Sequence, residues 1–181
     1  MWSFIMQFSK SLMNATLFTA AGLLSIASAN AAEPNPATSS FGVSMDVDSI
    51  CTVKSKPSDV NFGKIQAGKA TTAITGSTTL TLNCSKGDDA TISLKTASNP
   101  DGIDGTGTML GGDNGAEEVG YKLTTDAAGE TAWGTGDNAF ITAAATNYET
   151  DIATTIYLTV TDAADVTPGN YKDTVNISVA Y

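Results

Sequence analysis

The residues of this chain that could do chemistry are few, and their types exclude several kinds of site. The 181-residue sequence contains no histidine and no arginine, and it has two cysteines, Cys51 and Cys84. Without histidine there can be no Ser-His-Asp triad, no Cys-His pair and no histidine-ligated zinc. Two cysteines are also too few for a four-cysteine metal site. An enzyme built on this chain would have to use carboxylates, lysine, tyrosine or a bound metal.

The acidic residues are the remaining candidates for catalysis or metal binding. Five of them lie in or just after a glycine-rich stretch: Asp101, Asp104, Asp113, Glu117 and Glu118. A calcium loop of the EF-hand type needs acids at its first, third and fifth positions, where this stretch has Asp101, Ile103 and Gly105. Adjacent residues of a strand point to opposite faces, so Glu117 and Glu118 make a poor acid–base pair. We therefore predict a solvated loop, no metal or cofactor, no catalytic residues and no enzymatic activity.

The charge balance limits the partners of the chain. Nine basic residues, all of them lysine, stand against 19 acidic ones, which gives a net charge of −10 and a pI of about 4.1. Nucleic-acid binding needs a basic face that neutralises phosphates, and anionic membrane surfaces attract basic segments. The composition therefore predicts no nucleic-acid partner and no membrane docking or insertion. Hydrophobic residues make up 41% of the chain, which is enough for a buried core.

The first 31 residues have the parts of an export signal. Lys10 supplies a positive charge, a mostly apolar run follows over residues 12–27, and Ala29-Asn30-Ala31 has the small-x-small pattern of a cleavage site. A membrane anchor is the alternative, but polar residues interrupt the run, which is shorter than the ~20 apolar residues that a span requires. We therefore predict a signal peptide over residues 1–31, cleavage after Ala31 and export of the mature chain.

Export gives the two cysteines a structural interpretation. In an oxidising compartment an even pair of cysteines forms a disulfide by default, and the C-x-x-C spacing typical of a redox-active dithiol is absent. We predict a bond between Cys51 and Cys84. Closing a loop of this length is worth roughly 3–4 kcal/mol in the chain-entropy description of disulfides.

The elements that must position these residues alternate apolar and polar side chains with a period of two, which is typical of strands with one buried face. The first such run, over residues 41–47, follows a leader that contains prolines. Further strands are predicted at residues 60–63, 78–84, 91–94, 119–123, 152–161 and 171–181. Turn-rich connections are predicted at residues 99–115 and 131–138, where Gly, Asp and Asn are frequent. No stretch of the mature chain has apolar residues at helical spacing, so we predict an all-β sandwich or barrel.

The two ends of the mature chain indicate how such a sandwich could be completed. The last alternating run, Val175, Ile177, Val179 and Tyr181, reaches the end of the sequence, where a closing strand would normally follow. The first run could leave the body of its own domain. A strand from a neighbouring subunit can cover an unpaired edge, because it adds main-chain hydrogen bonds and places alternate side chains in the open core. An ordinary sandwich that contains both runs is the alternative.

Several short motifs in a fixed order resemble those of a known family. They are Phe41-Gly-Val-Ser-Met-Asp-Val before Cys51-Thr-Val, then Asn61-Phe-Gly, Leu82-Asn-Cys, Val119-Gly-Tyr-Lys-Leu, Trp133-Gly, and Pro168-Gly-Asn-Tyr-Lys-Asp-Thr-Val with the terminal run. Together with two cysteines and an export signal, they make the chain resemble the spore coat protein U domain family, which includes the pilins of archaic chaperone–usher pili. Residues 101–115 depart from that family, whose members often carry an arginine before the methionine.

The resemblance implies an incomplete immunoglobulin-like β-sandwich of six to seven strands, with one disulfide and a missing last strand that is supplied by another chain. Residues 49–181 would form this pilin domain, and residues 32–48 would form a leader that contains the donor strand. The donor side chains would be Phe41, Val43, Met45 and Val47. The acceptor edge, which also pairs with a chaperone, would be Val175, Ile177, Val179 and Tyr181. Cys51 and Cys84 would tie the start of the body to its second long strand.

The resemblance also implies partners and a place of action. A periplasmic chaperone would fill the groove first, and an outer-membrane usher would let the donor strand of the next copy replace it. The resulting homopolymer would be a surface fibre for attachment and biofilm formation. Two other functions stay open: a secreted spore or cyst coat component, and a lectin-like adhesin domain that binds a ligand through its loops. A two-domain adhesin is expected to exceed ~150 mature residues, so length favours a shaft subunit.

Overall fold

A computed structural model of the chain describes residues 38–68, 74–112, 115–162 and 164–181. The predicted signal peptide, residues 1–31, lies outside the described residues. The chain divides into two compact units, Met1–Ser44 and Met45–Tyr181. The first unit contributes only residues 38–44 to the description, and they form no helix or strand. All of the sheet structure described below belongs to the second unit.

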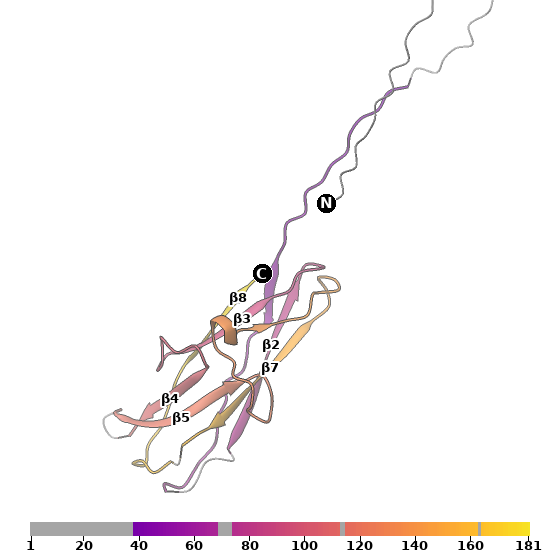
Figure 1. Ribbon diagram of the computed structural model, residues 1–181. Helices are drawn as coiled ribbons and strands as arrows, with labels where there is room; N and C mark the ends of the chain where they lie inside the picture. The colour runs from indigo at the N-terminus through magenta and orange to yellow at the C-terminus, as the bar shows by residue number, and fades with distance from the viewer. Residues whose placement is uncertain (1–37, 69–73, 113–114, 163) are drawn as a thin grey trace, which may run out of the picture. The chain divides into compact units, whose positions relative to one another are not determined.

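The second unit contains two antiparallel sheets (Figure 1). The larger sheet has the order β1-β2-β7-β5-β4, and the smaller one has the order β6-β3-β8. The strands are β1 (Cys51–Ser55), β2 (Thr75–Cys84), β3 (Thr91–Thr96), β4 (Thr106–Gly111), β5 (Glu117–Thr124), β6 (Phe140–Ile141), β7 (Ile152–Val160) and β8 (Val175–Ala180). A short 3-10 helix, η1 (Gly136–Asn138), precedes β6. The prediction of an all-β fold is confirmed.

The core lies between the two sheets, and the period of two in the sequence places it there. On β2 the buried residues include Leu80 and Leu82, on β3 they include Ile92 and Leu94, and neighbouring polar residues on these strands face outward. Trp133 is completely buried, and its indole Nε1 donates a hydrogen bond of 2.9 Å to the backbone oxygen of Ile92. This partner satisfies the polar group that burial of a tryptophan would otherwise leave unpaired.

The predicted disulfide is present between Cys51 and Cys84. The two residues face each other in the register of β1 and β2, so the bond ties the first strand of the body to the second. Just outside it, the backbone N–H of Ile50 donates to Ser85 Oγ at 2.9 Å. The start of β1 is therefore fixed to β2 by both a covalent bond and hydrogen bonds.

Two expectations about secondary structure were wrong. Residues 60–63 are not a strand, because Asn61 Oδ1 accepts a hydrogen bond from the Gly63 N–H at 2.8 Å and Gly63 has a φ of 78°, which turns the chain. Residues 106–111 were expected in a turn-rich connection, but they form β4 and pair with β5. Its Gly107 suits the strand because a Cβ there would lie 2.8 Å from the Tyr121 ring.

The described part of the chain has eight strands, where six to seven were expected. Residues 41–47 and 60–63 form no strand, whereas β1, β4 and β6, a strand of two residues that pairs with the start of β3, were not among the predicted strands. The segment that forms β4 was predicted as a loop because it contains glycine. Glycine is frequent in turns, but it also permits close packing of strands. The sandwich architecture itself is unaffected.

Replacing Cys51 and Cys84 together with alanine should lower the free energy of unfolding by roughly 3–4 kcal/mol, because the unfolded chain gains the entropy of an open loop. Urea unfolding of the oxidised mature protein and of the double variant would measure the difference. A double variant Ser39→Ala/Ser40→Ala, outside the sheets, is the control and should unfold at the same urea concentration as the parent. Equal stability of the double cysteine variant and the parent would contradict the prediction.

Candidate functional site

The strand β8 has one paired edge and one open edge. It pairs with β3 in a register that aligns Val175 with Thr96, and the Ala97 N–H donates to the Thr174 oxygen at 2.8 Å. In an antiparallel pair, residues that exchange backbone hydrogen bonds alternate with residues whose N–H and C=O point the other way. The N–H and C=O groups of Val175, Ile177 and Val179 therefore point away from β3. No strand among the described residues pairs with that edge.

Beside the open edge lies a groove of about 1200 Å³. One wall is β8, which contributes the half-buried side chains of Val175, Ile177 and Val179. The opposite wall is the segment 56–65, which contributes Val60 and Phe62. The floor is the inner face of the larger sheet, with the side chains Leu80, Val119, Tyr121, Leu123, Ile156 and Leu158. The groove is thus apolar, with a buried floor and half-buried walls, and it runs along the edge where backbone groups are unpaired.

A glycine fixes the position of the wall opposite β8. A Cβ at Gly76 of β2 would lie 2.5 Å from Val60 Cγ1 and 3.3 Å from the Phe62 ring, so only glycine lets this wall lie so close to the sheet. The Thr78 hydroxyl also donates to the Ser58 oxygen at 2.9 Å. Held on β2 in this way, the wall does not pair with β8, and the groove stays open between them.

A buried polar cluster anchors the beginning of β8. The Tyr121 hydroxyl donates to Asp173 Oδ2 at 2.7 Å, and the Ser98 hydroxyl donates to the same oxygen at 2.6 Å. Burial, together with the bond to Asp173, raises the pKa of Tyr121 well above its ordinary value. Tyr121 therefore remains a neutral hydrogen-bond donor at any physiological pH. The cluster positions a strand that has a neighbour on only one side.

A second carboxylate closes the end of the groove where β8 begins. Glu117 Oε2 accepts hydrogen bonds from the Thr167 N–H at 2.8 Å and from the Tyr171 hydroxyl at 2.9 Å, and the Thr167 hydroxyl also donates to it. These bonds, chiefly the one from the Thr167 side chain, lower the pKa of Glu117. The carboxylate thus holds the turn before β8 against β5.

The predicted donor residues and the predicted edge residues lie in different surroundings. Phe41, Val43, Met45 and Val47 are 88%, 86%, 83% and 78% exposed, in a stretch that forms no strand. Of the edge residues, Val175, Ile177 and Val179 line the groove. Tyr181 follows the end of β8, is 62% exposed and is not among the groove residues.

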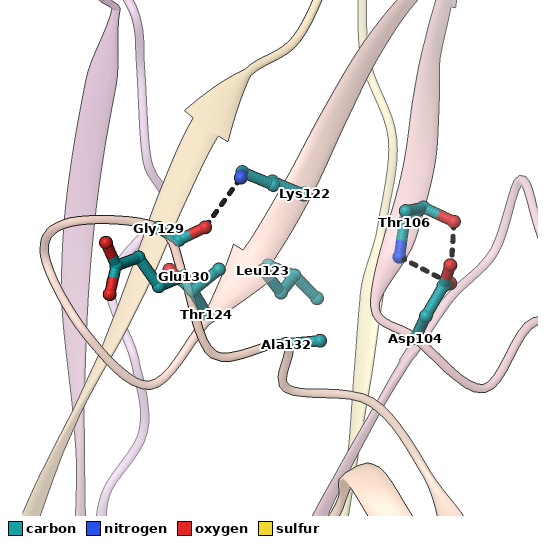
Figure 2. A pocket seen from close by; sticks show the side chains of 8 residues that line it. All are labelled: Asp104, Thr106, Lys122, Leu123, Thr124, Gly129, Glu130 and Ala132. Carbon is teal, nitrogen blue, oxygen red and sulfur yellow. Dashed lines mark hydrogen bonds between the residues drawn. The ribbon is translucent and has the colours of Figure 1, made fainter.

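A smaller polar pocket of about 190 Å³ lies against the outer part of β5 (Figure 2). Lys122 Nζ donates to the Gly129 oxygen at 2.6 Å, and Asp104 accepts a hydrogen bond of 2.7 Å from the Thr106 hydroxyl. This bond is the main reason that the pKa of Asp104 is lowered. Lys122 and Asp104 are therefore engaged in local bonds that fix loops. In the part of the chain that the structure describes, no three acidic or cysteine side chains are grouped as ligands for a metal.

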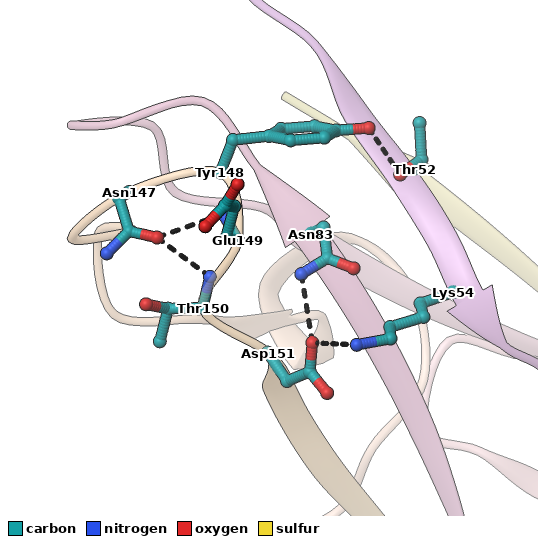
Figure 3. A network of polar contacts seen from close by, with 8 residues as sticks. All are labelled: Thr52, Lys54, Asn83, Asn147, Tyr148, Glu149, Thr150 and Asp151. Atoms are coloured by element: carbon teal, nitrogen blue, oxygen red, sulfur yellow. Dashed lines mark hydrogen bonds and ion pairs between the residues drawn. The ribbon is translucent and has the colours of Figure 1, made fainter.

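A polar network fastens β1 to the loop before β7 (Figure 3). Lys54 Nζ lies 2.5 Å from Asp151 Oδ1, and the Asn83 amide donates to the same oxygen at 3.0 Å. The bond from Lys54 is the main cause of the lowered pKa of Asp151. The hydroxyls of Thr52 and Tyr148 are 3.1 Å apart and share a hydrogen bond. The network holds the strand that directly follows the exposed residues 41–47.

Sequence reasoning found β8 and the exposed run but missed several residues of the groove. The sequence suggested Glu117 only as a candidate for metal binding or catalysis and placed Asp173 only in the last predicted strand. It suggested no role for Gly76. Their roles depend on partners 50 or more residues away for Glu117 and Asp173, and 14 to 16 residues away for Gly76. No local pattern in the sequence could have shown these contacts.

The fold agrees with what comparison with known proteins finds. A sequence profile of the Spore Coat Protein U domain matches residues 37–178, and the chain belongs to this family. No match was found among curated proteins. In the described residues there is no helix long and apolar enough to span a membrane.

The fold is also similar to that of solved structures. One of them is a chain in the crystal structure of the CsuC–CsuE chaperone–tip adhesion subunit pre-assembly complex, from the archaic chaperone–usher Csu pili of Acinetobacter baumannii. The TM-score is 0.52 at 19% identity, and the match covers 75% of this chain and 40% of that chain. The likeness bears out the predicted immunoglobulin-like sandwich.

The variant Glu117→Gln should make stability less dependent on pH. Because the folded-state pKa is lowered, the carboxylate contributes stability above its unfolded pKa, and this contribution is lost as the pH falls through the folded value. The variant should be less stable than the parent at pH 7, and the difference should shrink below about pH 4. Urea midpoints over this range measure it, with Glu118→Gln on the opposite face of β5 as the matched control. A difference that stays constant with pH would contradict the prediction.

Proposed function

We propose that this protein is a structural pilus subunit that polymerises by donor-strand exchange. Residues 41–47 of one copy enter the groove beside β8 of the next copy and complete its sandwich. The role is mechanical rather than catalytic. The product is a homopolymeric fibre on the cell surface, which serves attachment and biofilm formation.

The observation that carries the proposal is the open edge of β8 above an apolar groove, together with a separate apolar run of the same chain. Val175, Ile177 and Val179 leave their N–H and C=O groups directed away from β3. A strand laid along this edge would satisfy those groups and would place every second side chain in the groove. Residues 41–47 have that alternation, and their apolar side chains are exposed.

Burial of the donor side chains would supply a favourable contribution to assembly. Burying an exposed side chain of this size contributes about 1.5–3 kcal/mol, so the four donor side chains contribute roughly 6–12 kcal/mol before costs. Ordering the strand and joining two molecules oppose this gain. Backbone hydrogen bonds along β8 add to it, because each pairs groups that the groove would otherwise leave without a partner.

The same edge needs protection before assembly, since an unpaired strand above an exposed core is prone to aggregation. We infer that a periplasmic chaperone covers it first and that an outer-membrane usher directs its replacement by the next copy. The signal peptide predicted at residues 1–31 would bring the chain to that compartment. Membership of the Spore Coat Protein U domain family and the fold shared with a chain of a chaperone–subunit complex support this assignment.

Deleting residues 32–47 should give a subunit that still forms a complex with its chaperone but no longer forms fibres. The groove lies in residues 53–179 and is retained, whereas the segment that would fill the next groove is lost. Co-purification with the chaperone measures the first property, and electron microscopy of surface fibres measures the second. Normal fibres from the truncated protein would contradict the mechanism.

Single substitutions test the same mechanism without removing chain. Met45→Asp places a charge where the donor strand should enter an apolar groove, and it should abolish fibres while chaperone binding persists. Ser44→Asp introduces the same side chain at the neighbouring position, which faces outward, and fibres should still form. Equal effects of the two substitutions would argue against an inserted strand with a period of two.

A further inference from the structure

The outward-facing row of β8 carries a pattern of its own. Between Lys172 and Ala180 every second residue is exposed, and this row consists of Lys172, Thr174, Asn176, Ser178 and Ala180. We propose that this row is a recognition surface in addition to the groove. It contacts the polar residues of the incoming strand and fixes the register of that strand. The inference rests on the proposed function and adds to it a defined pairing between two copies of this chain.

The apolar side chains limit the possible registers. In an antiparallel pair, residues directly opposite each other lie on the same face of the sheet. Only one register places all four donor side chains opposite apolar residues, three of them in β8 and the fourth Tyr181, which follows it. Its pairs are Phe41 with Tyr181, Val43 with Val179, Met45 with Ile177, and Val47 with Val175.

Shifting the strand by two residues in either direction loses one of these pairs. In one direction Val47 would face Asp173, a carboxylate already engaged by Tyr121 and Ser98. In the other direction Val175 would face the polar residue Ser49. The register with four apolar pairs also covers the exposed ring of Tyr181 with that of Phe41.

The outward residues match in the same register. Ser44 lies opposite Ser178, Asp46 opposite Asn176, and Asp48 opposite Thr174. Each acid thus meets a side chain that can donate a hydrogen bond to it. Lys172 lies diagonally beside Asp48, within reach of a long side chain. In the described residues Lys172 forms no ion pair. Its neighbour on the side away from the groove is Leu110, and Glu118 is the next residue across, beyond Leu110.

Charge also sets the direction of the strand. An antiparallel strand brings Asp46 and Asp48 to the end of the groove where Lys172 lies. A parallel strand would bring them to the opposite end, because Thr91 of β3 pairs with Ala180 there. The turn that leads into β3 at that end has two acids, Asp88 and Asp89, and one lysine, Lys86. Repulsion from these acids disfavours the parallel arrangement.

Cysteine pairs on the outward faces test the register in assembled fibres of the full chain. Residues 44 and 178 would form a pair without mutual backbone hydrogen bonds, with Cα atoms about 4.5 Å apart, which suits a disulfide. The double variant Ser44→Cys/Ser178→Cys should therefore give a covalent ladder that survives boiling in detergent without reductant. The matched variant Ser44→Cys/Asn176→Cys, in which the pair is displaced by two residues, should give almost no covalent ladder. The single variants Ser44→Cys and Ser178→Cys should give none.

The possible results separate the register from the function. A ladder from the displaced pair, or fibres without a ladder from either pair, would overturn the register while leaving strand exchange in place. A parent protein that stays a stable monomer with its chaperone and usher present would overturn the proposed function itself. The contact between Lys172 and Asp48 is tested separately, through the rate of fibre formation at low salt.

Lys172→Glu should slow fibre formation at low salt, and adding Asp48→Lys to it should restore the rate. Lys86→Glu, the same change at the opposite end of the sheet, is the control and should leave the rate near that of the parent. An equal loss from Lys172→Glu and Lys86→Glu, or no recovery in the double variant, would overturn the role of Lys172.

Discussion

The structure depends on one unmet requirement, the pairing of the backbone groups on the open edge of β8. Buried or half-buried N–H and C=O groups need partners, and Val175, Ile177 and Val179 direct theirs toward a groove instead of a strand. The wall that could have closed the groove is held against β2 at Gly76. Because both walls of the groove are held in place, the groove is a fixed feature of the sandwich, with room for one further strand.

A domain that lacks the packing contacts of one strand needs other stabilising contacts. Here they lie near the strands that border the groove. The disulfide and the Lys54–Asp151 contact fix β1 to its neighbours, while Tyr121 and Glu117 fix the start of β8 and the turn before it. These ties lie at the margins of the groove, where the hydrophobic contacts of a complete sandwich would otherwise have given support. Tyr121 takes part in both the ties and the groove, because its ring lines the groove while its hydroxyl is bonded to Asp173.

Sequence patterns predicted most of the strands, including the β8 wall of the groove, but not the wall opposite it. Alternation found β2, β7 and β8, because one buried face leaves a signal with a period of two. It failed for β4, where glycines needed for close packing resemble turn residues. It also failed for the segment around Val60 and Phe62, which alternates like a strand but packs on the sheet without pairing. Both failures arise because packing against distant residues decides the outcome, and a local pattern contains no such information.

The segment at residues 41–47 illustrates a further tension between solubility and assembly. In the proposed function its apolar side chains must be available to another copy, yet an exposed apolar segment invites unspecific pairing. The intervening residues, Gly42, Ser44 and Asp46, with Asp48 beyond them, oppose that tendency through polarity, negative charge and the flexibility of glycine. In a chain with a net charge of −10, acids on the strand repel most surfaces of a sister molecule. The uncharged polar residues of β8, with Lys172 before them, would not repel such a strand, and this agrees with the proposed pairing.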